Sequence, residues 1–298
     1  MEKKILLVVN PVAGKGTTSK DINQIKENFE MSGFEVETKL TTLDNSAEKI
    51  VEKSDSKEDI IVAIGGDGTL NGVVNGVTKS KKNVKLGFIP FGTTNDFART
   101  LKIPTDRFFL SKNINDFKYK KCDTGKFNEK YFNYVSAFGV FAETSFSTSR
   151  KEKNKFGRLA YIRTGTKNFI ETEQAYHLKV TLDGEVIEGD FEYGSISNSK
   201  YIGGFQLFKE DEINIDDGEF EVILIKKTKN KAELLRTYTK LAMQVRDDNV
   251  IYTKAKNITI TGHRNPDVDC IASCLGLSLL IKKVFKRKAI VVNTDKMQ

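Results

Sequence analysis

The chain is poor in the residues that cross-link or rigidify small proteins. Among its 298 residues it has no tryptophan, four prolines, three cysteines and two histidines. The cysteines Cys122, Cys270 and Cys274 form neither a disulfide framework nor a zinc-ligand spacing, which is typical of proteins kept in a reducing cytosol. With so few prolines and 30% charged residues, no stretch has the composition of a disordered segment.

Long apolar runs are also missing. The longest apolar-looking stretch is CIASCLGLSLLI, residues 270–281, which is shorter than the ~20 residues needed to cross a bilayer. The opening MEKKILLVVN lacks the long apolar region and cleavage site of a signal peptide, so we expect a soluble, cytoplasmic protein. The net charge of +8 favours anionic partners such as nucleotides or acidic lipids. Because the lysines are scattered, we expect no nucleic-acid partner.

The order of apolar and turn residues predicts two kinds of sheet. Through residue 121, short apolar runs alternate with helical patterns, which indicates a parallel sheet covered by helices. The following segments are joined by Asp-Gly and Gly-Gly turns, which indicate antiparallel strands. Helical patterns interrupt them near residues 156–170 and 231–246. The second pattern predicts an apolar face made of Leu234, Leu235, Tyr238, Leu241, Ala242 and Val245.

The segment DIIVAIGGDGTLNGVVNGV, residues 59–77, carries the first chemical signal. Residues 60–64 read as a buried strand, and Leu70, Val73, Val74 and Val77 share one face of a helix. Between them, three glycines would let backbone N–H groups approach a ligand at a helix N-terminus. A tight strand-to-helix turn is the simpler interpretation, but three glycines exceed what a turn needs. Their place at the carboxyl edge of the sheet favours phosphate binding.

Two further loops follow predicted strands. NPVAGKG places Lys15 between glycines, but it has neither the Walker A spacing nor a complete G-x-G-x-x-G pattern. In PFGTTNDFAR, Asn95 and Asp96 either cap the next helix or bind a ligand, and the sequence leaves both open. Together with Asp123, the loops bring three carboxylates, those of Asp67, Asp96 and Asp123, toward one predicted phosphate site. Such carboxylates would hold Mg²⁺ through waters, and phosphoryl transfer would then depend on positioning and charge neutralisation.

These motifs resemble those of the bacterial diacylglycerol kinases and related lipid kinases. NPVAGKG, GGDGTLN and GFIPFGTTNDFAR occur in the order and approximate spacing of that family, and YIGGFQLFKEDEINIDDGEFEVILI resembles its second-domain signature. The similarity covers about residues 1–261. GGDGT alone would also admit NAD kinases and the sphingoid-base and ceramide kinases. The Asn-Pro opening of the first loop and the Gly-Thr-x-Asn-Asp-Phe-x-Arg pattern of the third separate lipid kinases from NAD kinases.

The resemblance implies a fold of α/β plus all-β class, of the NAD kinase/diacylglycerol kinase type. A three-layer α/β nucleotide-binding domain would span residues 1–121, and a β-sandwich domain would span residues 122–261, with the site in the cleft between them. The implied activity is phosphorylation of diacylglycerol to phosphatidic acid, with ATP as co-substrate and Mg²⁺ as cofactor. The implied partners are ATP and a diacylglycerol-like lipid at an anionic membrane surface, and a homodimer is possible. The protein would then lie at the periphery of the inner membrane surface.

The resemblance also implies roles for individual residues. The catalytic acidic network around Mg²⁺ would consist of Asp67, Asp96 and Asp123. A second, structural Mg²⁺ would bind the carboxylate of Asp217 and the backbone carbonyls of Asn214 and Glu219. Without the resemblance, Asp217 would be read as part of an ordinary Asp-Gly hairpin. The residues expected to contact ATP are Asn10, Pro11, Val12, Ala13, Gly14, Thr41, Gly65, Gly66, Asp67, Gly68, Thr69, Leu70, Asn71 and Thr93.

The C-terminal region departs from the family. Family members carry an Asp-Gly-Glu triplet past residue 265 whose aspartate is the general base, whereas this chain has Ile271 there. Residues 262–298 instead resemble the strand-helix-strand start of the DHH phosphoesterases and manganese-dependent pyrophosphatases. In that case His263, Asp267 and Asp269 would bind Mn²⁺, a mixed N/O set suited to it. The later motifs are absent, so a complete phosphoesterase is excluded, and a chance polar turn is the alternative.

Three functional hypotheses remain from the sequence. The first is an ATP- and Mg²⁺-dependent diacylglycerol kinase. The second is a kinase for another lipid hydroxyl, with NAD kinase a more distant alternative. The third is a catalytically impaired, nucleotide-binding homologue that has lost its general base.

Overall fold

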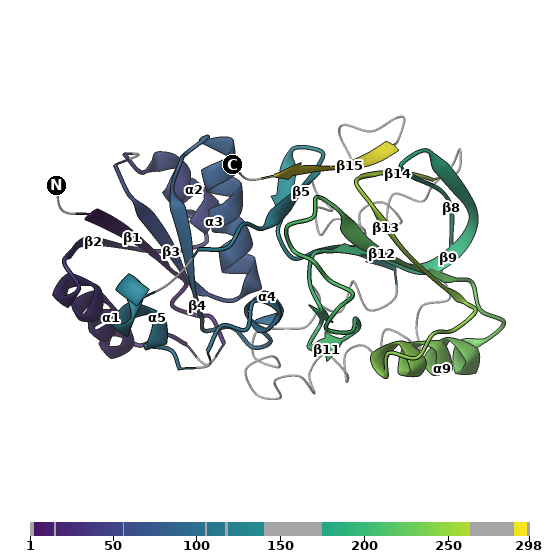
Figure 1. Cartoon of the computed structure of the whole chain (residues 1–298), viewed down its shortest axis with the longest axis horizontal. Helices are drawn as coiled ribbons and strands as arrows, with labels where there is room; N and C mark the ends of the chain where they lie inside the picture. Colours follow the sequence, from purple (N-terminus) through teal and green to yellow (C-terminus); the bar gives the residue numbers. More distant parts are fainter. Residues whose placement is uncertain are drawn as a thin grey trace. The chain divides into compact units, whose positions relative to one another are not determined.

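The structure is a computed structural model that describes residues 3–14, 16–55, 57–104, 106–116, 119–139, 175–262 and 289–296 (Figure 1). The chain divides into two compact units, Met1–Lys120 and Lys121–Gln298, and each is described by itself. Lys15, the helix predicted near residues 156–170, and the metal ligands predicted at His263, Asp267 and Asp269 lie outside the described residues.

The first unit contains a parallel sheet of four strands in the order β2-β1-β3-β4. Every residue of the central strand β3 is buried, as expected for a continuous apolar run between two neighbours. The strands are β1 (Lys3–Val9), β2 (Phe34–Leu40), β3 (Ile60–Gly65) and β4 (Lys85–Pro90). The helices are α1 (Ser19–Met31), α2 (Ala47–Lys53), α3 (Asp67–Lys79), α4 (Asp96–Thr100), α5 (Phe109–Lys112) and the short 3-10 helix η1 (Ile114–Asp116).

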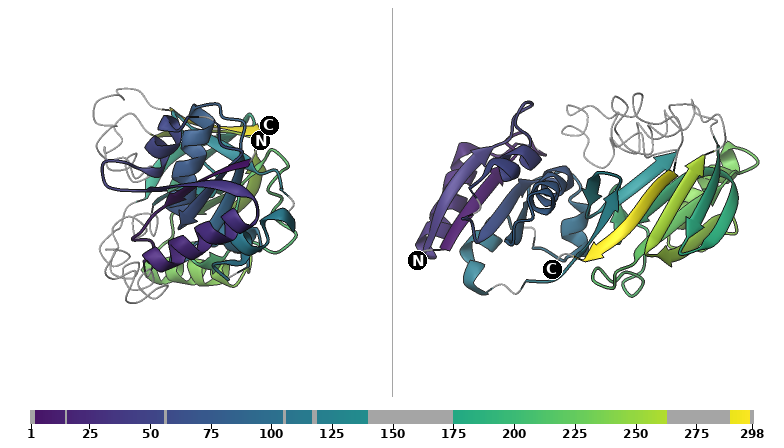
Figure 2. Two further views of the ribbon diagram at one scale, coloured as in Figure 1. Left: turned by 90° about the vertical axis from the view of Figure 1, so that its left-hand side faces the viewer. Right: turned by 90° about the horizontal axis from the view of Figure 1, so that it is seen from above.

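Helices cover both faces of this sheet. Ile25 and Phe29 of α1 are fully buried in a core shared with β1 and β3. On the other face α2 and α3 pack closely, because a Cβ added at Gly76 of α3 would meet the side chain of Val51 in α2. Figure 2 shows α1 on one side of the sheet and α2 and α3 on the other. This is the parallel, helix-covered region that the sequence predicts.

Two helices of the first unit begin with different N-terminal caps. Thr18 caps α1 in a capping box with Asp21, in which each side chain accepts the other residue's backbone N–H. In α3, Gly66 is the N-cap and no side chain caps the helix. The apolar face predicted for α3 is confirmed, since Leu70, Val73, Val74 and Val77 are all buried.

The second unit contains an antiparallel sheet. The described strands follow the order β13-β12-β9-β8-β14-β15-β5-β6, β7 also pairs with β9, and β10 and β11 form a separate hairpin. Residues 289–296 therefore belong to this sheet, where β15 pairs with β14 and β5. The strands are β5 (Asp123–Phe127), β6 (Lys130–Phe132), β7 (Val135–Gly139), β8 (Tyr176–Leu182), β9 (Glu185–Ser197), β10 (Tyr201–Ile202), β11 (Phe205–Gln206), β12 (Phe220–Lys226), β13 (Val250–Ala255), β14 (Asn257–Gly262) and β15 (Ala289–Lys296).

One helix, α9 (Lys231–Ala242), covers part of this sheet and buries Leu234 and Leu241. The wider apolar face predicted for it is wrong, because Leu235 is 51% exposed and Val245 is 46% exposed. The helix ends at Ala242, so Val245 lies beyond it, and Leu235 is turned about 100° from Leu234. Within the described residues, no helix has the length and apolar character needed to cross a membrane.

Candidate functional site

Three glycine-containing loops of the first unit meet at the carboxyl edge of its sheet. They are residues 10–14 and 16–18 after β1, residues 65–69 at the end of β3 and the start of α3, and residues 91–95 after β4. Gly14 has a φ of +56°, and a Cβ there would collide with the carbonyl of Phe91. A Cβ on Gly92 would lie 2.5 Å from the Cα of Gly66. These glycines are therefore needed because the loops touch each other through their backbones.

Asp67 joins two of the loops. Its Oδ2 accepts the backbone N–H of Asp96 at 3.1 Å, and its Oδ1 accepts that of Phe97 at 3.0 Å. These donors are the first backbone groups of α4, so Asp67 acts as the N-terminal cap of that helix. Asn95 precedes the helix with a left-handed φ of 49°, and its amide donates to the carbonyl of Gly92. The sequence left open whether Asn95 and Asp96 cap this helix or bind a ligand, and the capping carboxylate is that of Asp67, from a different loop.

Asp67 also shares its surroundings with a second carboxylate. Asp96 is completely buried beside it, and the guanidinium of Arg99 lies 3.4 Å from Asp96 Oδ1. Burial, reinforced by the nearby negative charge of Asp96, raises the pKa of Asp67 to about 6. A cation placed against this pair would relieve the repulsion between the two carboxylates.

The same edge presents polar groups that a nucleotide could use. Asn10 donates from Nδ2 to Thr69 Oγ1 at 3.2 Å, which connects the first loop to the second. The side-chain carbonyl oxygens of Asn71 and Asn95 are buried and accept no hydrogen bond from the residues that the structure describes. Because α3 has no side-chain cap, its N-terminus can face a phosphate.

All residues predicted to contact ATP lie in the first unit. They follow the carboxyl ends of its four strands, and the short backbone bond from Thr41 N–H to the Val9 carbonyl places the β2 loop beside β1. By strand end, they are Asn10 to Gly14 after β1, Thr41 after β2, Gly65 to Asn71 at the end of β3 and the start of α3, and Thr93 after β4.

Asp123 lies in the second unit, at the start of β5. Its side chain is completely buried, and its Oδ2 accepts the backbone N–H of Gly218 at 2.5 Å. The amide of Asn198 donates to the Asp123 carbonyl at 3.1 Å. Asp123 is thereby tied to the turn around Asp217. Its participation in one network with Asp67 and Asp96 stays a prediction.

The turn predicted to hold a structural metal is organised by its own side chains. Asp217 Oδ1 accepts the backbone N–H of Glu219 at 3.0 Å, and Asn214 Oδ1 accepts that of Asp216 at 3.3 Å. The remaining oxygen of Asp217 lies 3.5 Å from Lys254 Nζ. In the part of the chain that the structure describes, no three His, Cys, Asp or Glu side chains converge as metal ligands.

Sequence reasoning missed two charged residues beside this turn. Glu221 is 3% exposed, and its Oε1 lies 3.1 Å from Lys254 Nζ. Burial raises the pKa of Glu221 to about 7, while Lys254 opposes that rise. No motif marks either residue, because they meet only through the pairing of β12 with β13.

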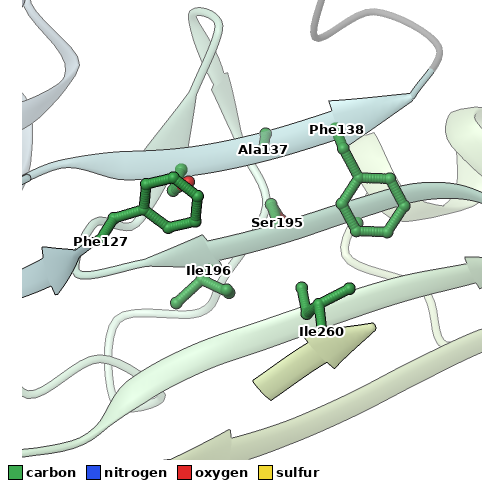
Figure 3. A pocket seen from close by; sticks show the side chains of 8 residues that line it. Phe127, Ala137, Phe138, Ser195, Ile196 and Ile260 are labelled. Carbon is green, nitrogen blue, oxygen red and sulfur yellow. The ribbon is translucent and has the colours of Figure 1, made fainter. Parts of the chain in front are cut away.

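The second unit also contains a small apolar pocket (Figure 3). It encloses about 280 Å³ with the open space at its mouth included, and strands β5, β7, β9 and β14 line it. The rings of Phe127 and Phe138 and the side chains of Ile196 and Ile260 form its lining, and Ser195 adds a hydroxyl group. These apolar side chains belong to the hydrophobic core of the unit, so the pocket is a small gap in the core packing.

Comparison with known proteins identifies the class of this fold and site. Residues 4–127 match the diacylglycerol kinase catalytic domain. The diacylglycerol kinase of Bacillus subtilis (strain 168) is 31% identical over 264 residues, which cover 87% of this chain and 86% of that protein. The diacylglycerol kinase of Staphylococcus haemolyticus (strain JCSC1435) is 33% identical over 264 residues, covering 88% of this chain and 79% of the relative.

A solved structure shows the same fold. The putative diacylglycerol kinase from Bacillus anthracis str. Sterne superimposes with a TM-score of 0.75 at 24% identity, covering 99% of this chain and 94% of that one. These similarities define a lipid kinase, a class of phosphotransferase. The chain belongs to the bacterial diacylglycerol kinase family.

Proposed function

We propose that this chain transfers the γ-phosphoryl group of ATP to the hydroxyl group of diacylglycerol, giving phosphatidic acid and ADP. The main support is the meeting of three glycine-containing loops around Asp67 and Asp96, in a chain of this family. Ligands of open α/β sheets bind at the carboxyl ends of the strands, where these loops lie. The phosphates of ATP would contact loop backbone and the N-terminus of α3.

The donor set of the first unit fits a magnesium ion. Asp67 and Asp96 place two buried or half-buried carboxylates side by side, and the unsatisfied carbonyl oxygens of Asn71 and Asn95 could accept hydrogen bonds from metal-bound waters. Oxygen ligands and retained waters are what Mg²⁺ prefers in proteins. When bound, Mg²⁺ would neutralise charge on the phosphates. We propose that Asp123 completes this acidic network from the second unit.

The transfer also needs a group that takes the proton of the lipid hydroxyl. Its oxygen forms a bond to the γ-phosphorus, the bond to ADP breaks, and the proton passes to a base. The family's Asp-Gly-Glu base has no counterpart at Ile271. Asp67, which lies where two of the loops meet, is one candidate for this base. Asp267 is the other candidate, and it lies outside the described residues.

The residues predicted for a second, structural Mg²⁺ fit less well. The one side-chain carboxylate of that set, from Asp217, already faces the ammonium of Lys254. Asn214 and Glu219 would supply only backbone carbonyls. We therefore assign this metal no part in the reaction.

A lipid substrate implies work at a membrane surface. The net charge of +8 supports attraction to anionic lipids. We propose peripheral association with the inner membrane surface on these grounds. A homodimer and a DHH-like role for residues 262–298 remain proposals from the sequence.

The direct test is phosphoryl transfer from radiolabelled ATP to a panel of acceptors in mixed micelles. The panel contains diacylglycerol, ceramide, a sphingoid base and NAD. We expect phosphatidic acid as the main product, formed only with a divalent cation and ATP present. Preferred labelling of another lipid would favour the second hypothesis, and labelling of NAD would overturn the lipid-kinase assignment.

The impaired-homologue alternative rests on the missing Asp-Gly-Glu base and needs its own test. A positioned general base contributes about 10²–10⁴-fold to such a step. We expect that replacing residues 262–298 with the C-terminal segments of an active relative raises the turnover rate. If the unmodified chain already phosphorylates diacylglycerol as fast as the graft, the missing base is unimportant and the alternative fails.

A further inference from the structure

The turn around Asp217 contains a positive charge of its own. Lys254 Nζ lies 3.5 Å from Asp217 Oδ2 and 3.1 Å from Glu221 Oε1, so one ammonium group bridges two carboxylates. The Asp217 side chain is 23% exposed and that of Lys254 is 38% exposed, whereas that of Glu221 is 3% exposed. The ammonium is therefore shared between a carboxylate near the surface and one in the interior.

Strand pairing fixes these groups in one row. Ser197 of β9 lies opposite Glu221 of β12, and Glu221 lies opposite Lys254 of β13. Directly opposed residues of antiparallel strands present their side chains on the same face of the sheet, a few ångströms apart. The position of the Lys254 side chain thus follows from the sheet and does not require a flexible loop.

Few other groups offset the cost of burying the Glu221 carboxylate. Ser197 is completely buried, and among the described residues its hydroxyl oxygen makes no hydrogen bond. Glu221 Oε2 likewise has no hydrogen-bond partner in the described part of the chain. A buried carboxylate without hydrogen bonds is costly unless a cation accompanies it. Lys254 supplies that cation. Because its ammonium offsets the buried charge of Glu221, the attraction between the two groups keeps the ammonium beside Asp217.

We propose that the Lys254 ammonium is the resident cation of the Asp217 turn, that Glu221 holds it there, and that a divalent metal binds this turn only by displacing it. The inference concerns the metal predicted at Asn214, Asp217 and Glu219, and it does not depend on the phosphoryl-transfer reaction. A tethered ammonium loses no translational freedom on binding, whereas an ion from solution does. The turn is consequently organised without added metal.

The test measures thermal unfolding of the full chain in a mildly alkaline buffer, with EDTA or with millimolar MgCl₂ at constant ionic strength. Lys254→Met removes the ammonium, and Asp217→Asn is made both alone and in the Lys254→Met background. The informative quantity is the Mg²⁺-induced shift in Tm that depends on Asp217. Any Mg²⁺ held by Asp67 and Asp96 adds equally to each member of a pair and cancels, so failure of the proposed kinase site would not mimic failure here.

In the wild-type background we expect an Asp217-dependent shift below about 1 °C, because the ammonium already occupies the turn. In the Lys254→Met background we expect a lower Tm in EDTA and an Asp217-dependent rise of about 3–6 °C on adding Mg²⁺. Lys256→Met is the matched control, since Lys256 is 53% exposed and lies 3.9 Å from Glu219. Its Mg²⁺ response should equal that of the wild type.

A second variant covers the case in which Lys254→Met does not fold. Glu221→Gln keeps the ammonium but removes the interior carboxylate that holds it, so we expect an Asp217-dependent Mg²⁺ shift between those of the other two backgrounds. The proposal is overturned by a large Asp217-dependent shift in the wild type. It is equally overturned if Lys254→Met, or Glu221→Gln where Lys254→Met is unfolded, leaves that shift unchanged.

Discussion

The two units each contain a carboxylate removed from solvent, but they stabilise it in different ways. In the first unit, Asp67 receives two backbone N–H groups from the start of α4. In the second, Glu221 depends on the side chain of Lys254 on the next strand. Fixed backbone dipoles leave Asp67 available to a ligand, whereas the Lys254 ammonium, held beside Asp217, competes with any cation that approaches. We therefore assign a part in the reaction to Asp67. Glu221 instead holds a cation that belongs to the chain, the ammonium group of Lys254.

Among the variants that test this comparison, the largest effect should come from separating the loops of the first unit. In Gly92→Ala, the new Cβ would lie 2.5 Å from both Gly66 Cα and Asn95 Oδ1, so the loops must move apart. Misplacement by about 1 Å can cost ~10²-fold in rate, and we expect a loss of ATP-dependent turnover of that order. The accompanying strain should lower the free energy of unfolding by ~1–3 kcal/mol, measured by denaturant titration.

Gly68→Ala is the matched control for stability, because a Cβ at that position meets no atom of the described residues within 4 Å. Its free energy of unfolding should not decrease. Equal destabilisation by Gly92→Ala and Gly68→Ala would show that close backbone contact does not hold the loops together. The first unit would then no longer differ from the second in depending on backbone contacts.

The loop site was accessible to prediction because its parts follow strands in the sequence. Glycines 65, 66 and 68 and Asp67 directly follow a buried apolar run, and parallel strands bring such loops to one edge. The cap of α4 was not predictable, because its donor groups and its acceptor Asp67 lie in different loops. Glu221 and Lys254 were missed for a similar reason: their meeting depends on the register of β12 and β13. The apolar face of α9 was overestimated because its pattern runs past the end of the helix.

A second prediction concerns the pH dependence of stability in metal-free protein. Burial, and to a smaller extent the negative charge of Asp96, raise the pKa of Asp67 from 3.8 to about 6. Between these pH values the unfolded chain has released its proton while the folded chain retains it. The free energy of unfolding should therefore fall by up to ~3 kcal/mol as the pH rises from about 4 to about 6.

Asp67→Asn removes this titration and serves as the reference. We expect the difference in unfolding free energy between wild type and Asp67→Asn to change over that interval and to be constant above neutral pH. Denaturant titrations in EDTA at several pH values measure it. Parallel curves for the two proteins would show that Asp67 is not perturbed by its surroundings.

The smallest expected effect concerns the hydrogen bond between the first and second loops. Thr69→Val removes the acceptor of the Asn10 amide while keeping a similar shape. We expect a loss of ~1 kcal/mol, or about fivefold, in the affinity for ATP, measured by calorimetric titration. Thr78→Val in the same helix is the matched control, since its hydroxyl donates to the carbonyl of Val74 within α3. If both substitutions lower the affinity for ATP equally, the hydrogen bond between the two loops does not contribute to ATP binding.

The central claim is that Asp67 of the first unit takes part in phosphoryl transfer to diacylglycerol. The most direct measurement is the rate of phosphatidic acid formation by Asp67→Asn and wild type, with saturating ATP and divalent cation. The account predicts a fall in kcat of at least ~10²-fold, with folding and ATP binding retained. Wild-type turnover by Asp67→Asn would contradict it.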